Sequence, residues 1–298
     1  MNSPGAIGSF LRKPYSAAYF FIFPSFLLLI VFHILPFLSS FIIAMLNMQV
    51  SFRTARFVGL EHYVRVFSDR FFINAVRVTL RFTATEIPIQ TAIGLLLAAL
   101  LTKNSPFNKL MRSIFFLPII VSATAMGIMW NLILHSNIGL ITHWLNMLGF
   151  GRLNFLNTPE LALNTVVFVT IWRTFGISIL ILVAAMQAVP DDYYDAAEID
   201  GAGKVRQFWS ITFPSILPAF WFLLMTRIIG SLQVFDIVFT LTRGRPNWTT
   251  ETLVAYVYRR AMDQSSNMGY ATAMCQFLFA FILIITMIQY TVMTKTEK

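Results

Sequence analysis

Asp195–Pro214 reads DAAEIDGAGKVRQFWSITFP and forms a polar, partly charged segment between two long apolar runs. These runs cover about residues 161–188 and 215–240, and each is long enough to cross a bilayer as a helix. The chain is 57% hydrophobic and only 12% charged. A polar segment of this length in so apolar a chain is expected to lie where the protein meets a soluble partner.

The composition indicates a membrane protein. The 298 residues have a mean hydropathy of +0.71, and their charged share is half the roughly 25% typical of soluble domains. The net charge is +9, but the basic residues are scattered and form no stripe, which argues against a nucleic acid partner. The single cysteine, Cys275, allows neither a disulfide framework nor a Cys-based metal site within the chain. We expect no metal site and no catalytic site, because no histidine pair or nucleophile–base set has suitable spacing.

Six segments are long and apolar enough to cross a bilayer as helices. They cover about residues 17–46, 75–101, 114–134, 161–188, 215–240 and 268–293. We therefore predict an all-α, polytopic membrane protein with six transmembrane helices. The first segment is too long for a signal-peptide core and precedes no small-residue cleavage site, so we expect it to be retained. Kinks are expected at Pro24, Pro36, Pro88 and Pro118, which lie within spans.

An even number of spans places both termini on one side of the membrane. The basic residues outside the spans do not identify that side, because nine lie on each side. All six lysines, however, lie on the side of the termini. The connections at about residues 48–74, 136–160 and 241–267 contain aromatic and turn residues, and we expect small ordered pieces there.

The polar segment has the signals of two short helices. Pro190 and the two aspartates that follow it favour a helix start, because carboxylates stabilise the positive end of the helix dipole. Residues 194–199 continue the helix, Gly201 and Gly203 indicate a tight turn, and residues 204–211 can form a second short helix. We expect the two helices to meet at an angle.

The segment also resembles the cytoplasmic coupling loop of binding-protein-dependent ABC importers. That family has the pattern E-A-A-x-x-D-G-A, then Phe, Ile and Pro at fixed spacing. The matching residues are Ala196, Ala197, Asp200, Gly201, Ala202, Phe208, Ile211 and Pro214. Asp195 departs from the pattern, since it keeps the charge of the usual Glu but is one methylene shorter.

The resemblance covers about residues 16–290. Residues 57–63 resemble the first outer loop of the family, and residues 252–258 and 268–273 resemble the entry to its last helix. The sequence resembles the first of two permease subunits in carbohydrate importers of the maltose type.

The resemblance implies a transport subunit that moves a carbohydrate delivered by an extracytoplasmic solute-binding protein. It implies a permease domain at 17–294, with the coupling loop at about 189–214 and cytoplasmic tails at 1–16 and 295–298. The expected location is the bacterial-type plasma (inner) membrane, with both termini cytoplasmic and the spans in lipid.

The expected partners are a second homologous permease and two ATP-binding cassette subunits. ATP and magnesium would be bound by those partners, so this chain is expected to be no enzyme and to hold no cofactor. Gly201-Ala-Gly-Lys204 ends in Gly-Lys but lacks the spacing of a phosphate-binding loop.

In the family, the coupling loop docks into a cleft on the ATP-binding subunit. The implied docking residues are Asp195, Ala196, Ala197, Glu198, Asp200, Gly201, Ala202 and Phe208. The small alanines would let the loop enter a groove, and the carboxylates of Asp195, Glu198 and Asp200 would accept hydrogen bonds from partner arginines.

Ionisable residues within spans are costly and usually face a cavity or a partner. They are Arg77, Arg81, Glu86, Arg173, Arg227 and Asp236. Alignment on the coupling loop places the substrate contacts of the family at Arg173, Thr174, Ile177, Arg227 and Ser231.

Two interpretations of the arginines among these residues remain open. Two guanidinium groups suit a carboxylate, sulfate or phosphate, which favours an acidic saccharide such as a uronate-containing oligosaccharide. Alternatively, Arg173 and Arg227 pair with Glu86, Asp236 or the partner subunit and only hold helices together.

Two other classes of function compete with the importer. An intramembrane enzyme would need a catalytic cluster within the spans, and the scattered charged residues provide none with convincing spacing. A secondary transporter would need two similar halves and no docking loop, and the sequence shows neither.

Overall fold

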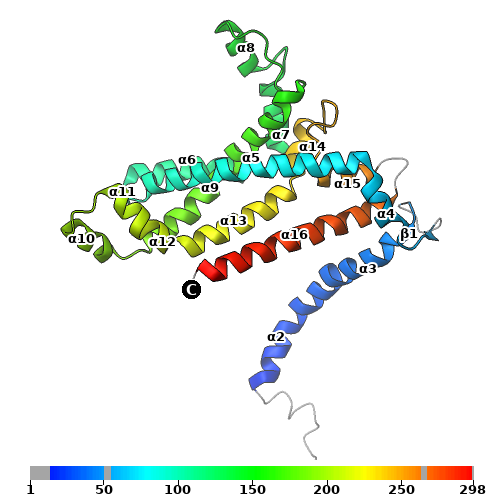
Figure 1. Cartoon of the computed structure of the whole chain (residues 1–298), viewed down its shortest axis with the longest axis horizontal. Helices are drawn as coiled ribbons and strands as arrows, with labels where there is room; N and C mark the ends of the chain where they lie inside the picture. The colour runs from blue at the N-terminus through cyan, green and yellow to red at the C-terminus, as the bar shows by residue number, and fades with distance from the viewer. Residues whose placement is uncertain (1–13, 50–54, 263–266, 297–298) are drawn as a thin grey trace, which may run out of the picture. The chain divides into compact units, whose positions relative to one another are not determined.

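A computed structural model describes residues 14–49, 55–262 and 267–296, and regular structure there is nearly all helical (Figure 1). Residues 1–13 of the expected N-terminal tail and residues 297–298 of the expected C-terminal tail lie outside the described residues. The chain divides into two compact units.

Among the described residues, five helices are long and apolar enough to cross a membrane, and a bent helix pair makes six if it counts as one span. The five are Phe21–Ala44, Arg70–Leu101, Pro159–Gln187, Leu217–Leu241 and Met268–Lys295. The predicted all-α membrane fold is therefore confirmed, and the number of crossings depends on the bent pair.

One unit comprises the chain up to Val66 together with Arg260–Gln276. Its helices and strands are α2 (Pro14–Leu29), the π-helical turn η1 (Ile30–Ile34), α3 (Leu35–Ala44), the antiparallel pair β1 (Leu46–Asn47) and β2 (Arg56–Phe57), most of α4 (Glu61–Ser68) and the start of α16 (Met268–Thr296). The expected distortion at Pro36 is found: η1 precedes it, and Leu35 donates its N–H to the carbonyl of Ile30, five residues back. Proline provides no N–H of its own, so the helix widens there. At Pro24, by contrast, α2 continues without a break.

The second unit comprises Phe67–Arg259 and Phe277–Lys298. At its centre α5 (Arg70–Leu101) packs along α9 (Pro159–Gln187), and α13 (Leu217–Leu232) contacts both helices (Figure 1). Two clusters of buried apolar side chains stabilise this pack. One surrounds Phe82 and Val238, and the other surrounds Ile179 and Leu223.

A close backbone approach joins α9 to α6 (Pro106–Ile120). A Cβ atom added at Gly176 would lie 2.1 Å from the carbonyl oxygen of Phe115. Only glycine therefore fits at position 176, and α6 lies directly against α9.

The predicted third span is not a continuous helix. The chain turns by 95° between α6 and α7 (Ala123–Ile133). Pro118, where a kink was expected, lies inside α6, and the turn follows at Val121, whose backbone is extended. The hydroxyl oxygen of Ser122 then accepts a hydrogen bond from the N–H of Ala125 at 3.2 Å and starts a new helix. The prediction of one span over residues 114–134 was therefore wrong about its continuity.

Beyond this turn, α7 packs against α14 (Asp236–Leu241), which a short break separates from α13. Two further helices, α8 (Leu140–Met147) and α15 (Leu253–Met262), lie in connections that were expected to contain small ordered pieces.

Candidate functional site

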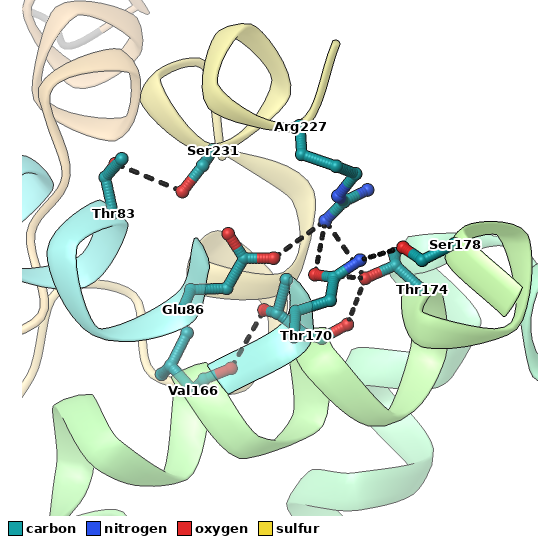
Figure 2. A network of polar contacts seen from close by, with 9 residues as sticks. Thr83, Glu86, Val166, Thr170, Thr174, Ser178, Arg227 and Ser231 are labelled. Carbon is teal, nitrogen blue, oxygen red and sulfur yellow. Dashed lines mark hydrogen bonds and ion pairs between the residues drawn. The ribbon is translucent and has the colours of Figure 1, made fainter. Parts of the chain in front are cut away.

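An ion pair between two spans is the centre of the candidate site. Glu86 on α5 is fully buried, and the side chain of Arg227 on α13 is 16% exposed. The Nη2 atom of Arg227 lies 2.7 Å from Oε1 of Glu86 (Figure 2). An ionised group in an apolar interior is costly unless it is paired, and here each charge offsets the other.

The same nitrogen connects a third helix to this pair. Arg227 donates from Nη2 to Oε1 of Gln90 at 2.8 Å and to the hydroxyl of Thr174 on α9 at 3.1 Å (Figure 2). Thr174 in turn donates to the carbonyl of Thr170 at 2.7 Å, and the amide of Gln90 donates to the hydroxyl of Ser178 at 3.2 Å. One guanidinium nitrogen therefore joins α5, α9 and α13.

The polar side chains around Arg227 recur at helical spacing. They are Thr83, Glu86 and Gln90 on α5, Thr170, Thr174 and Ser178 on α9, and Arg227 and Ser231 on α13. Intervals of three and four residues place each set on one face of its helix. A third hydrogen bond between α5 and α13, from Ser231 to Thr83 at 3.1 Å, extends the contact.

The structure thus brings together three of the five residues predicted to contact substrate, namely Thr174, Arg227 and Ser231. Arg173 is partly exposed and lies outside the network, and Ile177 contributes only apolar surface. The alternative in which Arg227 pairs with Glu86 is the arrangement that the structure shows.

Other members of the network are absent from the predicted site. The sequence analysis named Glu86 only as one possible partner of the arginines and omitted Thr83, Gln90 and Ser178, although the spacing of these residues within apolar spans marks them.

The charged groups keep unused hydrogen-bonding capacity. Within the described residues, Nε of Arg227, Nε of Arg173 and Oε2 of Glu86 are buried without a hydrogen-bond partner. The remaining guanidinium nitrogens of Arg173 also make no hydrogen bond to a described residue, although Asp236 and Arg227 lie within electrostatic range of it. Of these two arginines, Arg173 therefore has more donors left for a ligand.

The polar segment forms the two short helices that were predicted. They are α10 (Asp191–Ile199) and a second helix built from α11 (Lys204–Gln207), the π-helical turn η3 (Phe208–Thr212) and α12 (Phe213–Ser215). Between them Gly201 adopts a left-handed conformation with φ of +74°, which glycine tolerates best.

Two hydrogen bonds fix the angle between these helices. The hydroxyls of Tyr194 and Thr212 lie 2.8 Å apart, and the side-chain amide of Gln207 donates to the carbonyl of Ala202 at 3.0 Å. The first bond joins α10 to the second helix, and the other joins the turn to the second helix. The segment is therefore a defined unit.

One of the three carboxylates predicted to dock, those of Asp195, Glu198 and Asp200, is already engaged. Lys204 forms an ion pair with Glu198 and holds the pKa of that carboxyl below its ordinary value, through a hydrogen bond and through its charge. Asp195 and Asp200 are exposed.

Most of the predicted docking residues lie at the surface of this segment. Asp195, Ala196, Glu198, Asp200 and Gly201 are exposed, and Ala197 and Ala202 are half-buried. Exposed apolar side chains accompany them: Tyr193, Ile199, Val205 and Trp209.

Phe208 is placed differently from the other predicted docking residues. It is half-buried and packs against the cluster around Ile179 and Leu223, so it connects the segment to the helices of the second unit.

Comparisons with known proteins agree with this architecture. Residues 90–296 match the family described as binding-protein-dependent transport system inner membrane component. The trehalose/maltose transport system permease protein MalF of Thermococcus litoralis is 34% identical over 273 residues, or 91% of each chain. The sulfoquinovosyl glycerol transport system permease protein SmoG of Agrobacterium fabrum is 32% identical over 234 residues, covering 78% of this chain and 75% of the relative.

Among solved structures, a bacterial ABC transporter involved in the import of the acidic polysaccharide alginate has a similar fold. Its TM-score is 0.84, at 23% identity, over 95% of this chain and 96% of that chain. The chain belongs to the family of binding-protein-dependent transport system inner membrane components, which confirms the importer resemblance read from its sequence.

Proposed function

We propose that this chain is one of two transmembrane subunits of an ATP-driven importer, and that it translocates a carbohydrate received from an extracytoplasmic binding protein. A second homologous permease and two ATP-binding cassette subunits, which bind ATP and magnesium, complete the complex. The identity of 34% to a trehalose/maltose permease supports a carbohydrate substrate. Membership of a transport family argues against an intramembrane enzyme, and the name of that family, with its external binding protein, argues against a secondary transporter.

The observation that carries this proposal is the polar network of Arg227 within apolar spans. Hydroxyls and amides from α5, α9 and α13 meet there, next to Arg173. Such groups can exchange hydrogen bonds with sugar hydroxyls, and α13 leaves much of its surface uncovered, where a second permease can complete a substrate path.

Arg173 favours an acidic saccharide over a neutral one. Its guanidinium makes no hydrogen bond to a described residue, and a guanidinium binds a carboxylate or sulfate through two parallel hydrogen bonds. Arg227 uses Nη2 for the network, whereas its Nη1 makes no hydrogen bond to a described residue. Arg227 can therefore support the helices and still donate to a substrate.

A neutral carbohydrate is the second candidate, and the Glu86–Arg227 pair favours it. This pair already offsets the charge of Arg227. A site that used both arginines to bind anionic groups would bind them more strongly if Arg227 had no carboxylate partner.

The helices α10, α11 and α12 form the surface that docks on the ATP-binding subunit in this proposal. The exposed aspartates and the apolar side chains of Ile199 and Trp209 are available for that contact. In this proposal the segment and both termini lie in the cytoplasm.

The test is uptake and ATP hydrolysis by the complete complex in proteoliposomes, with its binding protein and either tri-galacturonate or maltotriose. Stimulation by tri-galacturonate alone supports the acidic substrate. Arg173→Gln should then raise the half-saturating concentration about 10- to 100-fold, since a hydrogen bond to a charged group contributes about 1.5–3 kcal/mol.

Arg81→Gln is the matched control, because Arg81 is an exposed arginine on α5 and should leave uptake unchanged. Stimulation by maltotriose alone would assign both arginines a structural role and leave the carbohydrate importer in place. No stimulation by any of a panel of saccharides would contradict the proposed function.

A further inference from the structure

A polar cavity of about 360 Å³ lies where α7 and α14 end, in the second unit. Its polar lining includes Asn131, His135, Asn154, Asn157, Arg243 and Arg245. None of the residues that line it belongs to the network of Arg227. The 16 residues of α13, about 24 Å of helix, separate α14, at the cavity, from the short helices α10 to α12. The cavity is therefore a feature distinct from both parts of the candidate site.

The charge of this lining is positive. Two arginines line the cavity, and none of the described residues that line it is Asp or Glu. The guanidinium of Arg245 forms no hydrogen bond or ion pair with a described residue, and the guanidinium of Arg243 lies 5.9 Å from the ring of Phe239. Both side chains are exposed, so the cavity offers two cations to a ligand that arrives from solvent.

The backbone that carries these arginines is held in place. Arg259 donates to both carboxylate oxygens of buried Glu251, at 3.1 and 3.0 Å, and to the carbonyl of Arg243 at 2.8 Å. The hydroxyl of Thr250 donates to the carbonyl of Arg245 at 2.8 Å. Arg243 itself adopts a left-handed conformation with φ of +52°, which is uncommon outside glycine and persists where surrounding contacts impose it. The two cations therefore project from a fixed loop.

We propose that this cavity is a second saccharide-binding site, for a sugar that carries an oxyanion. Arg245 and Arg243 bind the oxyanion, and the amides of Asn131, Asn154 and Asn157 bind sugar hydroxyls, since an amide both donates and accepts. The volume lies in the range of about 300–1,000 Å³ usual for small-molecule sites. This inference rests on the proposed carbohydrate function. The phosphate of a lipid headgroup shares the oxyanion chemistry, and the test separates the two sources.

The experiment measures binding of fluorescently labelled tri-galacturonate to the complete complex in nanodiscs of zwitterionic lipid, without ATP. Every variant also carries Arg173→Gln, so that binding at the network of Arg227 is weakened throughout. Arg245→Gln should lower the affinity at least tenfold. Arg152→Gln is the matched control, because Arg152 is exposed, precedes the lining residue Asn154 by two positions and does not itself line the cavity, and it should leave the affinity unchanged.

A second variant guards against a local folding defect. Asn157 is exposed, so Asn157→Trp can fill the cavity without disturbing a buried side chain, and it should abolish the same binding. Unchanged affinity in both Arg245→Gln and Asn157→Trp overturns the proposal.

Competition identifies the ligand. If inorganic phosphate or phosphatidylglycerol competes as strongly as unlabelled tri-galacturonate, the site takes headgroups and the saccharide assignment is wrong. Binding requires no transport, so a complex that binds at this cavity yet moves no sugar would contradict the proposed function alone.

Discussion

Glu86 accepts a hydrogen bond at 2.7 Å from Arg227, a residue 141 positions later in the chain. Oppositely charged side chains of two spans thus meet inside the helix pack, where the Glu86 side chain has no contact with solvent. Removing one partner of a buried pair is more costly than removing both, because the remaining charge stays buried without compensation.

Glu86→Gln should therefore destabilise the chain by about 3 kcal/mol, the lower end of the range for buried pairs, since Arg227 keeps 16% exposure. Thermal unfolding of the purified complex in detergent measures the change. Glu86→Gln combined with Arg227→Gln should recover part of the loss, and Arg81→Gln on the same helix should have no effect. A double variant less stable than Glu86→Gln alone would show that the charges are not coupled.

Gly176→Ala should destabilise the contact between α6 and α9. The added Cβ atom would lie 2.1 Å from the carbonyl oxygen of Phe115, so the helices must separate, at a cost of about 1–3 kcal/mol. Gly230→Ala in α13 is the control, because nothing lies within 4 Å of a Cβ atom there and alanine favours a helix by about 0.5–1 kcal/mol. The two variants should shift the unfolding temperature in opposite directions, and equal shifts would argue against close packing at Gly176.

Gly201→Val should uncouple ATP hydrolysis from transport while the spans remain folded. Valine cannot adopt a φ of +74° without strain, so the angle between α10 and the second short helix must change. Gly203→Val is the matched control, since Gly203 has a φ of −67° and open space around its Cβ position. Substrate-stimulated ATPase activity should fall at least tenfold for position 201 alone. Equal activity in both variants would show that docking does not depend on the geometry of this turn.

Glu251 should make stability depend on pH. Burial raises the pKa of Glu251 above its ordinary value of 4.5, and the charge and hydrogen bonds of Arg259 only partly oppose this. The folded state thus holds the proton more firmly, so this stabilisation is present below pH 4.5 and is lost as the pH rises through the folded pKa.

In Arg259→Gln the opposing charge is absent, so the pKa should rise further and the loss of stability should extend to higher pH. Unfolding measured between pH 4.5 and pH 7.5 checks this. Glu251→Gln should remove the pH dependence, and parallel profiles for the native chain and Arg259→Gln would contradict the assignment.

The sequence predicted the all-α fold and the two short helices of Asp191–Ser215, because apolar length, helix-start residues and glycines are local signals. It failed at the 95° turn between α6 and α7, where Val121 and Ser122 end one helix and start another inside a continuous apolar run. A hydropathy profile cannot detect a change in the direction of the chain within a run of equally apolar residues.

The site was predicted in part for a related reason. Resemblance located Thr174, Arg227 and Ser231, and the sequence analysis named Glu86 among the possible partners of Arg227. Which partner Arg227 takes depends on how three helices pack, and no local pattern reports that packing. The inward placement of Phe208 against the helices likewise depends on tertiary contact.

The sharp turn at Val121 and Ser122 also restricts what can surround this part of the chain. The 15 residues of α6 and the 11 residues of α7 span about 22 Å and 16 Å, so neither alone crosses a hydrocarbon core of about 30 Å. Helix ends leave carbonyl and N–H groups that hydrocarbon cannot satisfy, and irregular backbone at membrane depth persists only against protein or water. A turn of this kind at membrane depth must therefore face protein or water and not lipid tails.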